Sequence, residues 1–288
     1  YHMFKISNKN IDLIGDIHGH HTQLIKLLQK LGYTTDGSII AHPQDRKLAF
    51  VGDFINRGPY SEKVLELVKS LCEQGQATAV LGNHEFRLIQ NAVSGKPVPN
   101  EFAPFLQWLR SLPLFLELDS LRIVHAAWHF SSIALLKENV VSDDSFIKET
   151  LIKKSPYSKA TQHILSGIKV NIPKDLVLFD RFGIRRSKGR LKWWMNLKEK
   201  PFSECFFSPM TPVVPDRFPE EIELFELEPY PEHEKPVFIG HYCLPPNIPK
   251  VSGQVVCIDG CVTCDHTLWG YQYNGERIPN VSKLIETS

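Results

Sequence analysis

The sequence predicts an α/β fold with its sheet inside. Short apolar runs rich in β-branched residues recur along the chain, and each ends in a polar turn that contains glycine. Such runs are typical of buried strands. Between them lie stretches whose leucines and valines recur every three or four residues, as in helices that pack on one face. This alternation of strands and helices indicates that helices cover a central sheet.

Six apolar runs are the expected strands. They are, in chain order, IDLIG (11–15), KLAFVG (47–52), ATAVLG (77–82), LRIVHA (121–126), PVFIGH (236–241) and QVVCIDG (254–260). The longer segment VVCIDGCVTCDHTLWGYQY (255–273) is interpreted as two strands around a turn.

Two helices are expected between the first strands. The first carries one apolar face and ends before Gly32; its face is formed by Leu24, Leu27, Leu28 and Leu31. The second begins after Ser61, an expected N-cap, and ends before Gly75, an expected C′ residue. Its apolar face is formed by Val64, Leu65, Val68 and Leu71.

Bulk composition is that of a globular protein. Apolar residues make up 42% and charged residues 23% of the 288 residues, and the formal net charge is +1. Such a balance gives no overall field to attract nucleic acid or an acidic membrane. No apolar run approaches the roughly 18 residues that span a bilayer, and the N-terminus lacks an apolar signal core. A cytoplasmic location without membrane partners is expected.

The cysteines are expected to be reduced thiols, because a chain of this length does not need a disulfide framework. They are Cys72, Cys205, Cys243, Cys257, Cys261 and Cys264. Cys261 and Cys264 form a CxxC pair, and a zinc site would need a second pair such as Cys257 with His266. The favoured interpretation is that these cysteines are close only because a turn joins two strands.

One domain over residues 1–288 is expected, with a variable insert or cap at about 143–235. Residues 181–200 carry eight basic residues and one acidic residue, and residues 216–234 carry eight acidic residues and one basic residue. A basic stretch with tryptophans can bind nucleic acid by charge and stacking. The favoured interpretation is that the two segments are solvated or face one another.

Each expected strand is followed by residues that bind metals or phosphate. In α/β sheets such groups collect beyond the carboxyl ends of the strands. Carboxylate, imidazole and amide oxygen together suit manganese, iron or zinc. The residues concerned are Asp16 and His18 in GDIHG, Asp53 and Arg57 in GDFINRG, Asn83 and His84 in GNHE, His125 in VHA, and His241 in FIGH.

Local spacing supports a shared site. Asp16 and His18 are two residues apart, so both can face one metal. Gly15 and Gly19 permit tight or positive-φ backbone beside them. Asp53 can bridge two ions because a carboxylate has two oxygens. Three other histidines lie near these motifs but have no place in the expected set of ligands: His20, His21 and His129. They are expected at the surface or around the site.

These motifs, in this order, resemble the phosphoprotein-phosphatase branch of the calcineurin-like metallophosphoesterases. That branch also holds bacterial diadenosine tetraphosphatase and bacterial serine/threonine phosphatases. The resemblance spans residues 12 to 241 and implies a central β-sandwich flanked by helices, with a dinuclear metal site on one rim of the sheets.

The resemblance also implies roles for residues. The first metal would be held by Asp16, His18 and Asp53, and the second by Asp53, Asn83, His125 and His241. A hydroxide that bridges the two metals would attack phosphorus in line. Arg57 would bind the phosphate, with Arg181 as a second contact, and His84 would protonate the leaving oxygen.

Two positions depart from the family pattern. The motif is usually GDxxDRG, so Asn56 stands where an aspartate normally orients the histidine of GNHE. An amide can still orient His84, but it offers less charge to raise the pKa of the imidazole. The second departure is HAAW (125–128) where protein phosphatases usually have HGG.

The leading hypothesis is a metal-dependent phosphatase that hydrolyses a phosphomonoester or a nucleotide phosphoanhydride. Its substrate would be a phosphorylated small molecule, a nucleotide or a phosphoprotein. Asn56 alone supports an alternative, a catalytically weakened protein that binds metal and phosphorylated partners. The basic segment 181–200 supports another, a phosphatase or phosphodiesterase that processes nucleic-acid ends, whose binding would be sensitive to salt. Nucleic acid is not the favoured partner.

Overall fold

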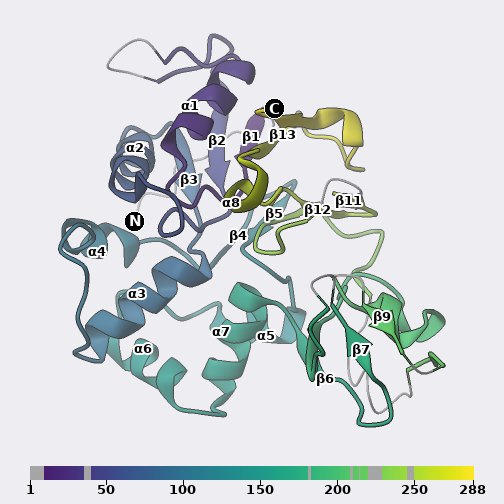
Figure 1. Cartoon of the computed structure of the whole chain (residues 1–288). Helices are drawn as coiled ribbons and strands as arrows, with labels where there is room; N and C mark the ends of the chain where they lie inside the picture. Colours follow the sequence, from purple (N-terminus) through teal and green to yellow (C-terminus); the bar gives the residue numbers. More distant parts are fainter. Residues whose placement is uncertain are drawn as a thin grey trace. The chain divides into compact units, whose positions relative to one another are not determined.

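The structure is a computed structural model of the chain. It describes residues 10–35, 40–180, 183–207, 210–213, 215–219, 229–244 and 250–288. The chain divides into two compact units. Unit 1 consists of Tyr1–Ser166 and Lys235–Ser288, and unit 2 consists of Gly167–Glu234. Figure 1 shows the elements of both.

The first sheet of unit 1 has the strand order β14-β13-β1-β2-β3. Strands β1, β2 and β3 run parallel, and β13 is antiparallel to β1. Ile14 pairs with Phe50, and Phe50 pairs with Ala79, so the parallel strands end level with one another. The bounds are β1 (Ile11–Ile14), β2 (Lys47–Phe50), β3 (Ala77–Ala79), β13 (Trp269–Tyr273) and β14 (Leu284–Glu286).

The second sheet has the order β11-β12-β10-β5-β4. Strand β10 is parallel to both β5 and β12. The carboxyl ends of these three strands therefore also lie at one rim. The bounds are β4 (Phe115–Glu117), β5 (Arg122–Val124), β10 (Val237–Ile239), β11 (Val251–Ser252) and β12 (Val255–Cys257).

The core of unit 1 lies between the two sheets. Side chains from both sheets form one buried hydrophobic cluster, which includes Leu13, Ala49, Ile123, Phe238, Val256 and Tyr271. Burial of this apolar surface is the main force that holds the sheets together. The prediction of a β-sandwich flanked by helices is confirmed.

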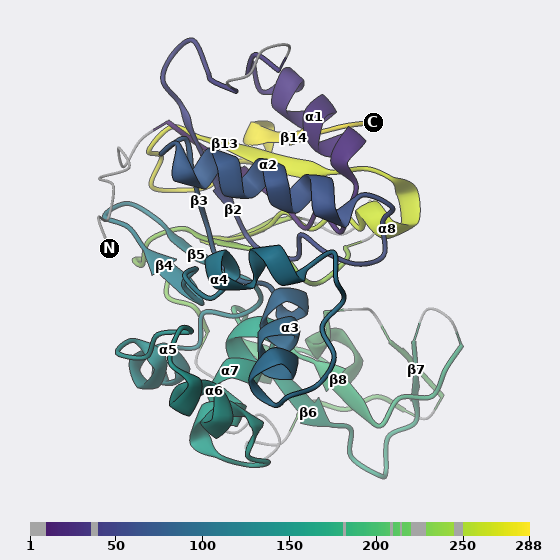
Figure 2. The same ribbon diagram turned by 90° about the vertical axis from the view of Figure 1, so that its left-hand side faces the viewer.

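Helices cover the outer faces of the sandwich. Figures 1 and 2 show α1 and α2 beside the first sheet, and α3, α5, α6 and α7 on the side of the second sheet. Their bounds are α1 (His21–Lys30), α2 (Ser61–Glu73), α3 (Asn83–Val93), α4 (Leu106–Leu109), α5 (Phe130–Leu136), α6 (Asp144–Leu151), α7 (Pro156–Ser166) and α8 (Val262–Asp265). Single 3₁₀ turns are η1 (Ala103–Phe105) and η4 (Val281–Lys283).

A buried ion pair anchors the first sheet. Asp12, in β1, is fully buried, and Arg46 is 4% exposed just before β2. The Arg46 guanidinium donates to both carboxylate oxygens of Asp12, with Nη2–Oδ1 at 2.7 Å and Nε–Oδ2 at 2.9 Å. Its Nη2 also donates to the Tyr273 carbonyl at the end of β13. Arg46 thus ties β1 and β13 to the chain that enters β2.

The six expected strands and both expected helices are present, with two local corrections. Tyr60, not Ser61, is the N-cap of α2. Ser61 is instead the first helical residue, because its Oγ accepts the Asn56 N–H at 2.9 Å. The segment 255–273 is not a hairpin, since β12 belongs to the second sheet and β13 to the first, with α8 between them.

The expectation of reduced thiols is wrong for two cysteines. Cys243 and Cys261 form a disulfide, 18 residues apart in sequence. They follow β10 and β12, which are neighbouring parallel strands, so the two loops begin side by side at the same rim. Cys72, Cys205, Cys257 and Cys264 are free.

Unit 2 is built from short elements around aromatic side chains. Two-stranded sheets pair β6 with β8 and β7 with β9. Trp193 is 2% exposed and packs edge-on against Tyr230. Trp194 packs in the same way on Phe207. The elements are β6 (Lys169–Asn171), β7 (Leu178–Phe179), β8 (Lys188–Arg190), η2 (Leu197–Glu199), η3 (Phe202–Cys205) and β9 (Thr211–Pro212).

The two charged segments meet within unit 2. The Tyr230 N–H donates to the Trp194 carbonyl, which joins residues of 216–234 to residues of 181–200. Trp193 is committed to the core of this unit rather than available for stacking with bases. Residues 181–182 and 220–228 lie outside the described residues. An insert or cap at about 143–235 stays a prediction, as does a cytoplasmic location.

Within the part of the chain that the structure describes, no helix combines the length and apolar character needed to cross a membrane.

Candidate active site

The predicted site residues follow the ends of five parallel strands or begin the helix after one of them. Asp16 and His18 follow β1, and Asp53, Asn56 and Arg57 follow β2. Asn83 and His84 are the first two residues of α3, directly after β3. His125 follows β5 and His241 follows β10. The two sheets therefore contribute to one rim.

Asp53 lies at the centre of the site. It is 2% exposed, and its Oδ2 lies 3.5 Å from His18 Nε2 and 3.3 Å from His125 Nε2. Its Oδ1 accepts the His84 backbone N–H at 3.0 Å. One carboxylate oxygen is thus held by the backbone, while the other faces two imidazoles.

Both imidazoles are held by their other nitrogen. His18 Nδ1 lies 3.0 Å from the Ile55 carbonyl, and His125 Nδ1 lies 2.8 Å from the Val51 carbonyl. Because a carbonyl only accepts, each Nδ1 carries a proton, and Nε2 is the ring nitrogen that faces Asp53. The contact between each Nε2 and the carboxylate oxygen needs a proton or a cation between the two atoms. This is the usual orientation of metal-ligating histidines.

The site attracts positive charge. Burial lowers the pKa of His125, but Asp53 and then Asp16 outweigh it and raise the pKa to about 10. Burial would raise the pKa of Asp53, yet His125 and His18 hold it well below the usual range. The carboxylate therefore stays ionised in the interior.

Asp16 supplies an unsatisfied buried oxygen. Its Oδ2 accepts the His241 backbone N–H at 2.9 Å. Its Oδ1 is buried and has no hydrogen-bond partner among the described residues. Burial, followed by the nearby Asp259 charge, raises the pKa of Asp16. A cation would give Oδ1 its missing partner and relieve this cost.

Two groups of ligand atoms share Asp53. His18, Asp53 and His84 form the first group, and Asp53, His125 and His241 form the second; within each group the atoms lie within 4.8 Å of one another. Asn83 Oδ1 adds a neutral oxygen 3.1 Å from His125 Nε2. The residues present therefore fit a pair of divalent cations that share one carboxylate. His84, expected as a proton donor, lies in the first group.

His84 contacts Asn56 as the sequence predicts. Asn56 Nδ2 lies 2.8 Å from His84 Nδ1. In this orientation the amide donates to a neutral imidazole, which then carries its proton on Nε2. A half-turn of the amide presents Oδ1 instead, which accepts the Nδ1–H of an imidazolium. Asn56 can thus support both protonation states of His84 without favouring the charged one.

Arg57 is exposed at the edge of the site. Burial lowers the pKa of His84 and of His18, and the Arg57 charge adds to both effects. The guanidinium therefore adds positive charge to the field around these rings. Arg181, the other predicted phosphate contact, lies outside the described residues.

Several site residues have a left-handed backbone. Positive φ angles occur at His18 (44°), Asp53 (55°), Asn56 (69°), Arg57 (69°) and His241 (74°). Such conformations cost free energy in residues other than glycine and cluster at functional sites. The predicted roles of the neighbouring glycines are also confirmed: Gly19 has φ 70°, and a Cβ on Gly15 would meet the Ile258 carbonyl at 2.0 Å.

Glu85 is a buried residue that sequence analysis missed. Its carboxylate accepts backbone N–H groups from Gly82, Asp53, Phe54 and Ile55 at 2.8–3.2 Å. Burial, and then Asp53, raises its pKa to about 7. Glu85 shapes the loop that carries Asp53. The signal was its place in GNHE, three residues after Gly82, where a glutamate caps a helix.

Asp259 was also missed. It follows β12 at the same rim and is 5% exposed. Its Oδ2 accepts the Cys243 N–H at 2.6 Å, and its Oδ1 accepts the Cys261 N–H at 2.9 Å. It lies two residues after the end of β12, as Asp16 lies two residues after the end of β1, and its place near the end of the apolar run QVVCIDG was the available signal.

The remaining histidines near the motifs have local roles. His20 is 7% exposed, and its Nδ1 lies 2.9 Å from the His18 carbonyl. His129 is the N-cap of α5 and accepts the Ser132 N–H. His21 is the first residue of α1.

A cavity of about 440 Å³ opens beside Asn56. The loop before α2 and the first residues of α2 line most of it, and Glu101 and Phe102 complete the lining. Tyr60 in this wall is 46% exposed. The lining residues are Asn56, Gly58, Pro59, Tyr60, Ser61, Glu62, Lys63, Glu101 and Phe102.

Comparisons with known proteins identify the family of the chain. The family model described as calcineurin-like phosphoesterase matches residues 9–192. The chain is 53% identical over 74 residues to the asymmetrical bis(5′-nucleosyl)-tetraphosphatase of Geobacillus sp. (strain WCH70), covering 26% of this chain and 30% of that one. It is 40% identical over 87 residues to the enzyme of the same name from Bacillus subtilis (strain 168), covering 30% and 35%. These matches span about a third of the relatives' length.

A solved structure resembles the whole fold. The cold-active protein-tyrosine phosphatase of a psychrophilic Shewanella species superposes with a TM-score of 0.50 at 14% identity, covering 97% of this chain and 80% of that one. At this identity the likeness is one of fold alone.

Proposed function

We propose that this chain, which belongs to the calcineurin-like phosphoesterase family, hydrolyses phosphomonoesters or nucleotide phosphoanhydrides with two bound divalent cations. The observation that carries the proposal is the buried Asp53 carboxylate shared by two groups of ligand atoms. Manganese, iron and zinc suit this mixture of imidazole and oxygen ligands. The cations supply positive charge for a phosphate group and acidity for the attacking water.

The residues that would hold the cations come from both sheets. Asp53 is the shared ligand, and the Nδ1 hydrogen bonds of His18 and His125 keep their Nε2 atoms directed at it. The full proposed set is Asp16, His18, Asp53, Asn83, His125 and His241.

Arg57 would bind the phosphate oxygens. Its exposed position leaves the guanidinium free to meet an incoming substrate, and its planar donors match a phosphate group. His84 would give a proton to the leaving oxygen. Asn56 would orient it, since the amide contacts Nδ1 and leaves Nε2 to face the reaction.

A nucleotide is the favoured substrate class. If His84 protonates the leaving oxygen, the leaving group lies on the side of Asn56, where the 440 Å³ cavity opens. That volume is within the range of small-molecule sites, and the exposed Tyr60 ring offers a surface on which a base can stack. The tetraphosphatase names of the relatives point the same way. A phosphoprotein or the end of a nucleic acid is the other candidate class.

The test combines metal analysis with a hydrolysis panel. Purified protein is assayed with p-nitrophenyl phosphate, a phosphopeptide, a dinucleoside tetraphosphate and a 5′-phosphorylated RNA. We expect bound or activating divalent metal and the highest kcat/KM on the dinucleotide. Protein that neither binds nor responds to divalent metal would refute the proposal. A preference for the RNA, weakened by salt, would favour end processing instead.

The Asp53→Asn variant tests the shared ligand. An amide offers one ligand oxygen where the carboxylate offers two. We expect kcat to fall on the order of 10³-fold or more, at least the loss seen when a single charge-stabilising group is removed. Asp45→Asn is the matched control, because the Asp45 side chain is 87% exposed and forms a surface ion pair with Lys47. Activity near wild type in Asp53→Asn would reject the bridging role.

A further inference from the structure

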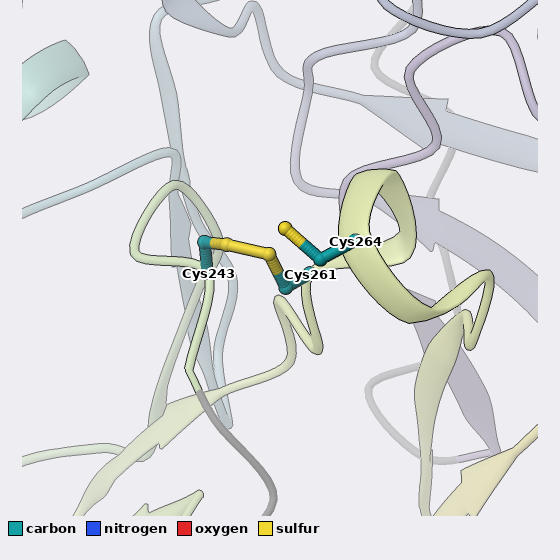
Figure 3. A group of neighbouring side chains, drawn as sticks. All are labelled: Cys243, Cys261 and Cys264. Carbon is teal, nitrogen blue, oxygen red and sulfur yellow. A yellow bond between two sulfur atoms is a disulfide. The ribbon is translucent and has the colours of Figure 1, made fainter. Parts of the chain in front are cut away.

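Three cysteines gather next to the site. Cys243 and Cys261 form the disulfide, and the sulfur atoms of Cys243, Cys261 and Cys264 all lie within 4.8 Å of one another. Figure 3 shows the Cys264 sulfur turned toward the bond between the other two. Cys264 is exposed and has a free thiol. A free thiol this close to a disulfide is placed to exchange with it.

Backbone hydrogen bonds keep the three residues together, and one of them runs from the Cys264 N–H to the Cys261 carbonyl at 2.8 Å. The Asp259 carboxylate accepts the N–H groups of both Cys243 and Cys261, and the Asp259 carbonyl accepts the Leu244 N–H at 3.1 Å. This clamp does not depend on which sulfur atoms are bonded. The cluster can therefore survive a change of disulfide partner.

Cys264 and Cys261 lie on the same side of a helical turn. Cys261 precedes α8, and Cys264 is three residues further on, a spacing that brings side chains together. Thr263 Oγ1 lies 3.8 Å from Cys261 Sγ and 3.9 Å from Cys264 Sγ. The hydroxyl contacts both sulfur atoms, so the same environment suits either partner of Cys261.

We propose that this cluster is a thiol–disulfide exchange site, in which Cys264 displaces Cys243 from Cys261. Cys264 loses its proton to solvent, and its thiolate attacks Cys261 Sγ. The Cys261–Cys264 bond forms as the Cys243–Cys261 bond breaks, and the electron pair leaves on the Cys243 sulfur, which takes up a proton. The exchange consumes no oxidant or reductant.

The exchange changes how the loop with His241 is held. Cys243 is two residues after His241, so the Cys243–Cys261 bond ties that loop to the β12 side of the rim. After exchange the loop keeps its Asp259 hydrogen bond but loses the covalent tie. The exposed Cys264 is also the point where a small thiol or disulfide from solvent can enter the cluster.

Labelling of Cys243 in the folded protein tests the proposal. The folded protein is treated with N-ethylmaleimide at neutral pH, and the reaction is stopped with acid. The protein is then digested without reductant, and its peptides are identified by mass spectrometry. In wild type we expect both disulfide pairings and alkylation of both Cys264 and Cys243. In Cys264→Ser, Cys243 stays in its bond, and its labelling falls roughly tenfold or more. Cys72→Ser, which changes a free cysteine of α2, is the control and keeps both pairings.

Three other outcomes of this experiment would overturn the proposal. A single pairing in wild type, or equal labelling of Cys243 with and without Cys264, would show that exchange does not occur. Alkylation of all three thiols would show that no disulfide is present. Release of one zinc per chain by wild type but not by Cys264→Ser would make the cluster a thiolate metal site instead.

Discussion

At the scale of single residues, the site depends on carboxylates that have different tasks. Asp53 faces the two imidazoles, whereas Glu85 and Asp259 accept backbone N–H groups and fix the loops. A buried polar group is costly unless it is hydrogen-bonded, and a buried charge is costly unless it is paired. Asp53 meets this condition through the two imidazoles, and Glu85 and Asp259 meet it through backbone N–H groups.

The Asn56→Asp variant tests how His84 works. An aspartate beside Nδ1 favours the imidazolium and raises the pKa of His84. The basic limb of the pH–rate profile should therefore move to higher pH. The value of kcat should rise, by about 10-fold or more, for substrates with poor leaving groups. The measurement is kcat against pH for an alkyl and an aryl phosphate. An unchanged profile would show that residue 56 does not tune the proton donor.

Motif spacing could predict Asp53, His18 and His125 as neighbours, because each directly follows a buried strand and such strands end at a common rim. It could not predict the task of Glu85. A carboxylate that accepts four backbone N–H groups is defined by the three-dimensional path of the loop, and spacing in sequence does not encode that path.

At the scale of elements, the spacing of apolar residues predicted most of the strands and helices. Burial of Leu24 and Val64 on helix faces follows from their spacing. The pairing of strands does not follow from such spacing, since β12 and β13 are close in sequence but belong to different sheets. A short apolar run in the sequence indicates a buried strand, but it does not indicate which strand lies next to it in the sheet. The Asp12–Arg46 pair was likewise not predicted, since neither residue belongs to a motif.

The Arg46→Met variant tests the anchor of the first sheet. It leaves the fully buried Asp12 carboxylate without its charged partner, while the Tyr33 hydroxyl still donates to Oδ2. We expect the free energy of unfolding to fall by about 3–5 kcal/mol in urea denaturation. Arg110→Met is the control, because its ion pair with Asp144 is partly exposed and should contribute about 1 kcal/mol or less. If the two variants lost the same free energy of unfolding, the Asp12–Arg46 pair would not be a special anchor of the first sheet.

The contact between α5 and α7 should make stability depend on pH. His163 Nδ1 lies 3.1 Å from Ser132 Oγ, and its ring packs edge-on to His129. Burial, with the charges of His129 and Lys159, lowers the pKa of His163 from 6.5 to about 4. The neutral ring therefore stabilises the fold fully above pH 6.5, and this contribution is lost as the pH falls toward 4.

Calorimetry of His163→Gln measures that contribution. Glutamine keeps a hydrogen-bonding side chain but cannot be protonated. Between pH 6.5 and 4.5 the Tm of wild type should fall by a few degrees more than the Tm of the variant, about 2–4 °C for each kcal/mol. Parallel curves would exclude His163 as the group responsible.

At the scale of the whole molecule, the proposed ligands join two sheets. Asp16, His18 and Asp53 come from the first sheet, and His125 and His241 from the second. Cations bound between them would bind the folded state only and so stabilise it by mass action. The architecture of unit 1 was predictable because five motifs lie at its strand ends. Unit 2 carries no such motif, and its aromatic packing was not predicted.

Chelation should therefore lower the stability of the sandwich. With metal at about 100 times its Kd, removal costs about 2.7 kcal/mol per site, so EDTA should lower the Tm by at least about 5 °C. Scanning calorimetry before and after dialysis measures this, with Asp53→Asn as the control that should respond weakly. A Tm unaffected by EDTA in wild type would contradict a shared metal site.

The contact between the His241 N–H and Asp16 Oδ2 joins residues 225 positions apart. During synthesis on the ribosome, His18, Asp53 and His84 all emerge long before His241. At roughly 5–20 residues per second, many seconds separate the completion of the two ligand groups. A nascent chain that stops early would contain one group and lack the other. If the two cations bind as proposed, the second group of ligands would be complete only after His241 has been made.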